Sequence, residues 1–484
     1  MRVHGWHWLL PILALAAAGS AYSAEPARRP NIVFILADDL GINDLGCYGR
    51  HDHRTPNLDR LARAGVRFTT AYCAQPVCSP TRAAILTGKS PARLHLTTFL
   101  QGRPDCASQK LLEPKFRLQL PPGEKTVADC LKEAGYATAC VGKWHLGGKP
   151  TNQGFDVYHP GRANTQPSDQ EGGKGEHGLT EAAIQFMAAN RDRPFFLYLA
   201  HHNPHIPYTA AAARVKDNSK AFEPTYAAVI ETLDDTVGRL LAKLDDLKLA
   251  EQTLVIFTSD NGGLHVPELA HQKVTHNTPF RAGKGFLYEG GTRIPLIVRW
   301  PGRAPAGKEI AAPVISTDWL PTLVEIAGAK LPAGIDGTSL AGLLSGKDGP
   351  GERPLFWHFP HYANQGGRPA GAIRQGEWKL IEHYENGTVE LFNLASDRGE
   401  TTDLSRQEPD RVKNLRDRLT RWRTEVGAQT NEVNPKFDPA LHRPLYEDID
   451  PSRYNPVTAS ADEFQRMLKW RKQMDAVVPR LKSP

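Results

Sequence analysis

The chain has 484 residues, of which 40% are hydrophobic, 23% charged and 8% aromatic. This composition is typical of a globular protein and excludes a disordered tail or a collagen-like fibre, although 42 Gly and 38 Pro indicate many loops. The 59 Lys and Arg against 53 Asp and Glu give a net charge of +6 without a dense basic run. Nucleic acid is therefore not an expected partner, whereas a small anionic substrate would suit the charge.

The N-terminus has the pattern of a secretory signal peptide over residues 1–23. Arg2 opens a short basic region, residues 8–18 are mostly apolar, and Ala21 and Ser23 are small residues before a cleavage site. The apolar stretch is too short for a comfortable membrane span, although an uncleaved N-terminal anchor is the alternative. We therefore expect an exported protein, periplasmic or secreted, with no membrane attachment after cleavage.

Six cysteines follow this segment, and in an exported chain they could form up to three disulfides. None belongs to a Cys-x-x-Cys pair, which disfavours a zinc site, and a chain of this size does not need disulfides to stabilise a core. If one cysteine has special chemistry, five remain, so at least one of those is unpaired. The six are Cys47, Cys73, Cys78, Cys106, Cys130 and Cys140.

Between residues 31 and 326, apolar runs alternate with amphipathic helical patterns. The alternation indicates an α/β fold with a large, mainly parallel or mixed sheet between two layers of helices. Ligands of such sheets bind at the carboxyl ends of the strands, so polar residues there are candidates for a site. Strands are predicted over 31–37, 195–200, 254–258 and 296–298, and helices over 57–64, 126–134, 180–189, 226–247 and 320–326.

After about residue 350 the pattern changes to that of a smaller antiparallel α+β unit. Residues 378–383 and 389–394 flank Glu385-Asn386-Gly387, which predicts a hairpin. A basic amphipathic helix is predicted over 409–426 and a last helix over 462–476, with a Pro-rich extended tail between them. We therefore divide the mature chain into a large domain over 24–350 and a C-terminal subdomain over 351–484.

Two predicted strands end in side chains that carry oxygen. Asp38 and Asp39 follow the first strand, and Asp260 and Asn261 follow the strand over 254–258. Three carboxylates at adjacent strand ends would repel one another without a cation, and their hard oxygen atoms suit one divalent ion, Ca²⁺ first and Mg²⁺ second. The alternative is that Asp39 and Asn261 only cap the turns that follow.

A second candidate feature is the segment Cys78-Ser79-Pro80-Thr81-Arg82. Pro80 suits the first turn of a helix, which places Cys78 at the helix N-terminus. The helix dipole there favours negative charge, so we expect a thiol with a lowered pKa and a reactive thiolate. The alternative is a buried structural cysteine beside a helix start.

These residues belong to a set of ordered motifs that resembles type I sulfatases, a family of the alkaline-phosphatase-like superfamily. The resemblance covers about residues 31–337, and a weaker similarity is present around Trp378-Lys379-Leu380 and residues 390–394. Its motifs are Ala37-Asp38-Asp39, Cys78-Ser79-Pro80-Thr81-Arg82 with Leu86-Thr87-Gly88, Gly142-Lys143-Trp144-His145-Leu146-Gly147, Pro204-His205-Ile206-Pro207, Ser259-Asp260-Asn261-Gly262, and Gly283-Lys284-Gly285 leading to Tyr288-Glu289-Gly290-Gly291-Thr292-Arg293.

The resemblance implies that a separate formylglycine-generating maturation enzyme oxidises Cys78 to Cα-formylglycine. One hydroxyl of the hydrated aldehyde would attack the sulfur of a sulfate ester, and the other would allow sulfate to leave afterwards. The resemblance also implies that the divalent cation is bound by Asp38, Asp39, Cys78, Asp260 and Asn261.

The remaining motif residues carry catalytic roles in the family. By this resemblance, Arg82 and Lys143 would hold the hydrated aldehyde, and His145 would be the base that triggers sulfate release. His205 and Lys284 would bind the sulfate oxygens, and one of them would protonate the departing alcohol. His201 and His202 lie beside His205 in the sequence and could contact the substrate or only pack.

The substrate is expected to be a sulfated carbohydrate, attacked at a terminal residue, with aryl sulfates as surrogates. Loops over 94–106, 154–178 and 356–374 are expected to frame the pocket. The last contains His358, His361, Tyr362, Arg368 and Arg374, which could bind carboxylate, sulfate or sugar hydroxyls, or could be a solvated surface between domains.

Two other functions are compatible with these motifs. The same site could hydrolyse a phosphonate or phosphate ester, because phosphoryl and sulfuryl transfer need similar stabilisation. If Cys78 is never converted, the chain could instead be a non-catalytic, calcium-dependent glycan-binding protein.

Overall fold

The computed structural model describes residues 1–5, 29–161, 168–268, 273–347 and 349–479. Most of the predicted signal peptide lies outside the described residues. Within the described residues, no helix is both long enough and apolar enough to cross a membrane. All six cysteines are free thiols, so the disulfides that the sequence allowed do not form.

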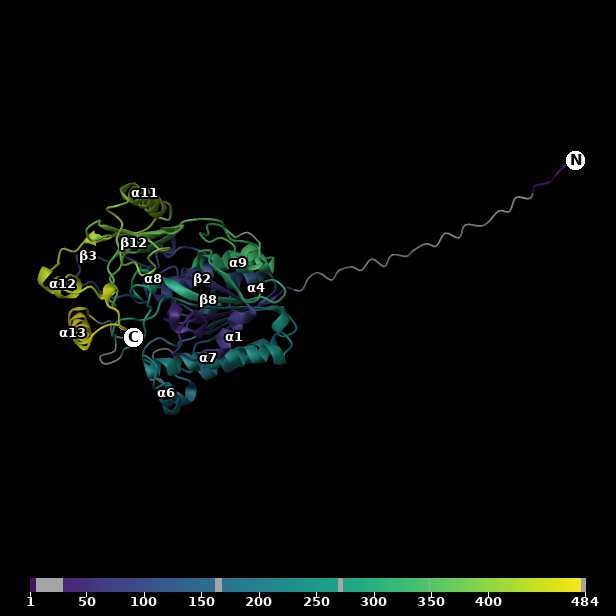
Figure 1. Ribbon diagram of the computed structural model, residues 1–484, viewed down its shortest axis with the longest axis horizontal. Helices are drawn as coiled ribbons and strands as arrows, with labels where there is room; N and C mark the ends of the chain where they lie inside the picture. Colours follow the sequence, from purple (N-terminus) through teal and green to yellow (C-terminus); the bar gives the residue numbers. More distant parts are fainter. Residues whose placement is uncertain (6–28, 162–167, 269–272, 348, 480–484) are drawn as a thin grey trace.

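The large domain is built on a mixed sheet, and within the described residues this sheet has nine strands (Figure 1). Its order is β10-β2-β8-β7-β1-β6-β4-β5, with β9 beside β2. The five strands from β7 to β5 are parallel, and β8 runs antiparallel to both β7 and β2. The bounds are β1 Asn31–Ala37, β2 Val66–Tyr72, β4 Ala137–Gly142, β5 Val157–His159, β6 Phe195–Ala200, β7 Thr253–Ser259, β8 Arg293–Arg299, β9 Lys308–Ile310 and β10 Val314–Ile315.

The central strand β1 explains why an unbroken apolar run is needed in this sheet. All seven of its residues are buried. Val33 and Ile35 pack into the core on one face of the sheet, and Ile32, Phe34 and Leu36 pack into the core on the other. Because successive side chains of a strand point to opposite faces, a strand covered on both sides must be apolar throughout.

Helices cover both faces of this sheet, as predicted. The longer ones on one face are α1 Pro56–Ala64, α5 Glu176–Ala189 and α7 Pro224–Asp246, and those on the other are α2 Cys78–Thr87, α4 Val127–Glu133 and α9 Trp319–Ala327. Figure 1 shows α1 and α7 below the sheet and α9 above it. Shorter helices are α3 Pro91–Leu94, α6 Ala212–Asp217, α8 Glu289–Thr292 and α10 Ala341–Leu344.

The C-terminal part forms a second, antiparallel sheet in the order β11-β12-β13-β14. The predicted hairpin joins β13 and β14. Its strands are β11 Leu355–Phe359, β12 Ala370–Gln375, β13 Trp378–His383 and β14 Val389–Asn393, and a two-stranded sheet pairs β3 Leu111–Leu112 with β15 Glu432–Val433. The helices are α11 Pro409–Glu425, which packs on the four-stranded sheet, α12 Pro439–Tyr446 and α13 Ala461–Val477.

A buried lysine connects the C-terminal sheet to α8 of the large domain. The Lys379 ammonium on β13 lies 2.9 Å from a carboxylate oxygen of Glu289 in α8 and 3.0 Å from one of Glu400, and all three side chains are fully buried. Burial alone would raise the pKa of Glu289, but the Lys379 and Arg293 charges outweigh it and lower that pKa to about 2. Burial raises the pKa of Glu400 to about 7.

We predict that Lys379→Met destabilises the protein because it leaves Glu289 beside Glu400 without their shared cation. Loss of one partner from a buried ionic network typically costs about 3–5 kcal/mol. The expected result is a clearly lower urea midpoint, measured by fluorescence. Lys413→Met is the matched control, since the Lys413 side chain on α11 is 80% exposed; equal midpoints for the two variants would contradict the prediction.

Candidate active site

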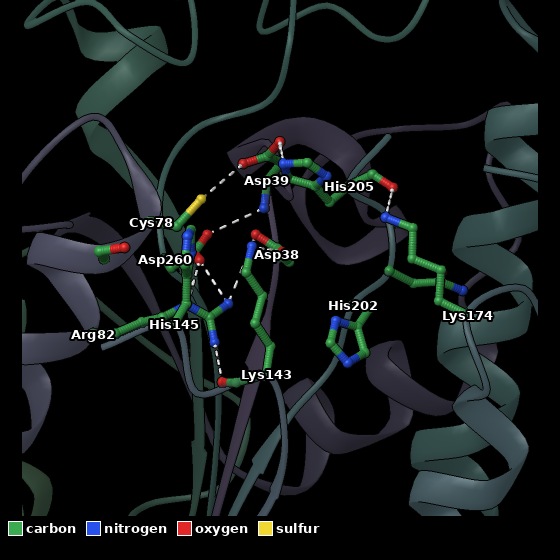
Figure 2. A network of polar contacts seen from close by, with 12 residues as sticks. Asp38, Asp39, Cys78, Arg82, Lys143, His145, Lys174, His202, His205 and Asp260 are labelled. Carbon is green, nitrogen blue, oxygen red and sulfur yellow. Dashed lines mark hydrogen bonds and ion pairs between the residues drawn. The ribbon is translucent and has the colours of Figure 1, made fainter. Parts of the chain in front are cut away.

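The predicted site residues converge at the carboxyl ends of the parallel strands (Figure 2). β1, β4, β6 and β7 run side by side, so the residues that follow them meet at one edge of the sheet. The α2 N-terminus and a loop before α8 approach the same edge. These elements contribute Asp38 and Asp39 after β1, Lys143 and His145 after β4, His205 after β6, Asp260 and Asn261 after β7, Cys78 and Arg82 from α2, and Lys284 from the loop.

Asp39 is the centre of the contacts among these residues. Its Oδ1 accepts a hydrogen bond from Asn261 Nδ2 at 2.8 Å and lies 3.8 Å from Cys78 Sγ, and its backbone N–H donates to Asp260 Oδ1 at 3.1 Å. Asp39 also has a positive φ of 65°, which is uncommon for a residue other than glycine. Such a conformation persists where the surrounding contacts hold it, as these do.

The donor set at this edge fits a divalent cation. Asp38 Oδ1 and Asn261 Oδ1 are buried without a hydrogen-bond partner, which is costly unless a ligand satisfies them. One ligand atom from each of Asp38, Asp39, Cys78 and His205 lies within 4.8 Å of the others. Carboxylate and amide oxygens predominate, so the chemistry is that of a hard ion such as Ca²⁺ or Mg²⁺.

Arg82 lies behind the carboxylates rather than beside Cys78. Its Nε and Nη2 donate to Asp260 Oδ2 at 2.9 and 2.7 Å, and its Nη1 donates to the Lys143 carbonyl at 2.8 Å. The side chain is fully buried. Arg82 thus neutralises Asp260 and holds the backbone of the β4 end, and none of its hydrogen bonds reaches Cys78.

Two lysines face the remaining carboxylates. Lys143 Nζ lies 2.5 Å from Asp38 Oδ2, and Lys284 Nζ lies 2.7 Å from Asp39 Oδ2. Burial would lower the pKa of each lysine, but the adjacent carboxylate outweighs burial and raises both pKa values. Both ammonium groups are therefore charged at neutral pH and stand beside Cys78.

The hydrogen bonds of His145 define its protonation. Its Nε2 lies 2.7 Å from the Leu100 carbonyl, which can only accept, so Nε2 carries the hydrogen. Its Nδ1 is buried without a partner. Burial, with the nearby Lys143 charge, lowers the pKa of His145 to about 3. The ring is neutral, and Nδ1 has a free lone pair that can accept a proton.

His205 has the opposite tautomer. Its Nδ1 donates to the Ile206 carbonyl, which leaves Nε2 unprotonated in the neutral ring. This Nε2 lies 3.7 Å from Asp39 Oδ2. Burial, with the Lys284 charge, lowers the pKa of His205 to about 3.

Cys78 begins α2, as predicted, but its thiol does not have the lowered pKa that we expected from the helix N-terminus. Burial is the largest influence and raises the pKa of Cys78 well above its usual value, despite the positive charges of Lys143 and Lys284. Desolvation disfavours a thiolate more than the helix end favours it. The expectation of a reactive thiolate is therefore wrong for this side chain.

A cavity of about 500 Å³ opens in front of these residues. Four predicted residues, Asp39, Arg82, Asp260 and Asn261, do not line it. The sequence gives Lys174 and Gln365 no individual role, although both lie in segments predicted to frame the pocket, and it gives no signal for Glu268, because none of the three belongs to a motif. The predicted residues that line it are Asp38, Cys78, Lys143, His145, His205 and Lys284.

The predicted framing loops contribute unequally to this cavity. Residues 94–106 supply Phe99 and Leu100, and residues 154–178 supply Tyr158, Pro160, Gly161 and Lys174. Residues 356–374 are not one continuous loop, because β11 and β12 occupy their two ends, and only Asn364 and Gln365 from this segment line the cavity.

None of the five polar residues predicted as a cluster in residues 356–374 lines this cavity. His361 is fully buried and bonded to Glu113 and Thr97, and His358 is buried against Tyr384. The nearby His201 is likewise buried in a pair with Glu176, whereas His202 lines the cavity.

Comparison with known proteins places these features in a family. The sulfatase family model matches residues 30–329, and a model of the C-terminal region of N-sulphoglucosamine sulphohydrolase matches residues 282–425. Human arylsulfatase A is 36% identical over 76% of this chain and 77% of its own length. Mouse steryl-sulfatase is 34% identical over 72% of each chain, and dog N-acetylgalactosamine-6-sulfatase is 35% identical over 73% of this chain and 72% of its own.

A solved structure agrees with these sequence relatives. The crystal structure of Ps i-CgsB in complex with k-i-k-neocarrahexaose has a TM-score of 0.69 and 29% identity, over 82% of this chain and 93% of that one. The likeness covers most of the residues in each protein.

We predict that Ca²⁺ raises the melting temperature of the protein by binding to Asp38, Asp39, Asp260 and Asn261. A ligand at one hundred times its dissociation constant adds about 2.7 kcal/mol of stability. In Asn261→Leu this gain should be largely lost, because the variant removes one unpartnered oxygen. Melting is followed by scanning calorimetry with and without Ca²⁺, and Asp417→Asn on the exposed face of α11 is the control. An equal Ca²⁺ effect in Asn261→Leu and wild type would place the ion elsewhere.

Proposed function

The chain belongs to the sulfatase family and hydrolyses sulfate esters, and we propose that it does so through a Cα-formylglycine formed from Cys78. The observation that carries this proposal is the position of Cys78: it begins α2, lines the cavity and lies beside Asp39, Lys143 and Lys284. A thiol whose pKa is raised by burial is a poor nucleophile here, which favours a modified residue. The oxidation would be performed by a separate formylglycine-generating enzyme.

The proposed cofactors supply what the unmodified side chains lack. The hydrated aldehyde offers one hydroxyl to attack sulfur and a second to permit sulfate release, and a divalent cation favours ionisation and offsets the charge of the sulfate. Ca²⁺ suits the donor set better than Mg²⁺ because its larger shell accepts five or more protein oxygens. The ligands that we propose are Asp38, Asp39, Asp260, Asn261 and residue 78.

We assign the proton-accepting role to His145. Because its Nε2 hydrogen is held by the Leu100 carbonyl, its Nδ1 lone pair is free to accept a proton from residue 78 when sulfate leaves; the pKa of about 3 makes the ring a weak base, so the assignment rests on this geometry. Lys143 places a fixed positive charge beside the same group, and Arg82 supports Lys143 and Asp260 from behind.

We propose that Lys284 donates the proton to the departing alcohol. Both Lys284 and His205 face the sulfate position, but Nε2 of the neutral His205 ring carries no hydrogen, while Lys284 is fully protonated. His205 then contributes by position and, once protonated, by charge. The choice between these two residues, open from the sequence, rests on these hydrogen bonds.

The substrate that we propose is a sulfated carbohydrate, attacked at a terminal sugar. A cavity of about 500 Å³ is of the size of small-molecule pockets and suits one or two sugar rings. Glu268 and Gln365 offer acceptors and donors for hydroxyl groups. The saccharide named in the complex of Ps i-CgsB is consistent with a substrate of this class.

We also propose that residues 1–23 are a signal peptide and that the protein is exported to the periplasm or the exterior. The catalytic domain would extend over 24–350, with residues 351–484 as its C-terminal subdomain. Lys379 and α13 join the two parts, so we expect them to act as one unit.

We predict that protein from a host with the maturation enzyme carries an aldehyde at residue 78. The tryptic peptide 68–82 contains both Cys73 and Cys78, so Cys73 is an internal control. After alkylation, mass spectrometry should find one modified thiol and one aldehyde in this peptide. Cys78→Ala should fold normally and lose turnover. Full turnover by protein with two alkylated thiols would contradict the mechanism.

We predict that Lys284→Ala lowers kcat by about 10²–10³-fold, the usual effect of losing a contact to the transition state. The loss should be larger for a carbohydrate sulfate than for 4-nitrophenyl sulfate, because a phenolate leaves without protonation. His205→Ala, the matched variant, should lower kcat for both substrates by similar factors. The reverse pattern would give the acid role to His205.

Matched 4-nitrophenyl phosphate and phosphonate esters should react more slowly than the sulfate.

A further inference from the structure

Lys174 is a buried ammonium that the mechanism above does not use. It precedes α5, only 2% of it is exposed, and it lines the cavity together with His202 and Cys78. Its Nζ donates to the carbonyl oxygens of His205 and Ile206, at 2.9 Å each. Figure 2 shows Lys174 on the opposite side of His205 from Cys78.

The charge of Lys174 is unmatched by any close anion. Lys143 and Lys284 each pair with a carboxylate, but among the described residues Lys174 has only two neutral carbonyls as partners. An ammonium has three hydrogens, so one remains for a ligand. A buried cation without a counter-ion costs free energy that an anionic ligand in the cavity would offset.

The cavity is also polarised across its width. Glu268 accepts a hydrogen bond from Gln365 Nε2 at 2.8 Å, and its charge acts on Lys284. The main charges acting on Lys174 come instead from Asp38, Lys143 and Asp39. A second anionic group of a bound sugar would therefore be repelled at the Glu268 wall and attracted at the Lys174 wall, while hydroxyl groups could donate to Glu268.

We propose that Lys174 determines specificity by binding a second anionic substituent of the substrate, a sulfate or carboxylate on the saccharide that carries the scissile sulfate. The inference rests on the proposed function, because it takes the Cys78 end of the cavity as the place of the scissile group. Lysine is a single point charge without the fork of arginine, so it can bind either anion.

The test compares a monosulfated saccharide with two counterparts, one carrying an added sulfate and one an added carboxylate. The variant Lys174→Gln removes the charge but keeps N–H donors for the two carbonyls, and Lys174→Met removes both. The exposed Lys220→Gln is the control. The wild type should prefer a doubly anionic substrate, and Lys174→Gln should lower that preference about 10–100-fold, mainly through KM, as expected for loss of a charged hydrogen bond. The preferred counterpart identifies the anion.

Two outcomes would overturn the inference. If Lys174→Gln keeps the wild-type preference while Lys174→Met loses it, the lysine only holds the His205 segment. If Lys174→Gln lowers kcat for 4-nitrophenyl sulfate and for all saccharides by one factor, it acts on the scissile sulfate. Calorimetric binding of the same saccharides to Cys78→Ala protein, with and without Lys174→Gln, measures the preference without turnover, so a failure of the formylglycine mechanism would not obscure the result.

Discussion

The site depends on charge compensation at one buried edge of the sheet. Asp38, Asp39 and Asp260 would repel one another there, and in a medium of low dielectric constant this repulsion is large. Arg82, Lys143 and Lys284 offset it through direct contacts with Asp260, Asp38 and Asp39, respectively. The same cations form the positive wall that an anionic substrate meets. Stability of the fold and affinity for the substrate therefore draw on the same three pairs.

Backbone carbonyl groups determine which ring nitrogen of each histidine beside this cluster carries a hydrogen. The Leu100 carbonyl fixes the hydrogen of His145 on Nε2, and the Ile206 carbonyl fixes that of His205 on Nδ1. Burial keeps both rings neutral. The Leu100 loop, which belongs to no motif, thus decides which nitrogen of His145 can accept a proton, and carbonyls of the His205 loop also hold Lys174.

Some strands could be predicted because burial on both faces of the sheet alone decides which residues they contain. β1 is buried on both faces, so its apolar run identified it. β4 is equally buried but consists of Ala137–Gly142, small residues whose pattern does not distinguish a strand from a loop. Residues 356–374 are predicted as a loop at the pocket, but β11 and β12 at the two ends of this segment pair with each other through the backbone and are strands.

By itself the sequence determined the elements that supply the chemistry: carboxylates after β1 and β7, a cysteine at the start of α2, and the Lys-x-His segment after β4. Local order suffices for these, because strand ends and helix starts follow from short-range patterns and their motifs stand in a recognisable order. Only the tertiary structure decided the thiol pKa of Cys78, the tautomers of the histidines and the place of Lys174. Each of those depends on burial and on partners distant in the chain, which no short-range pattern contains.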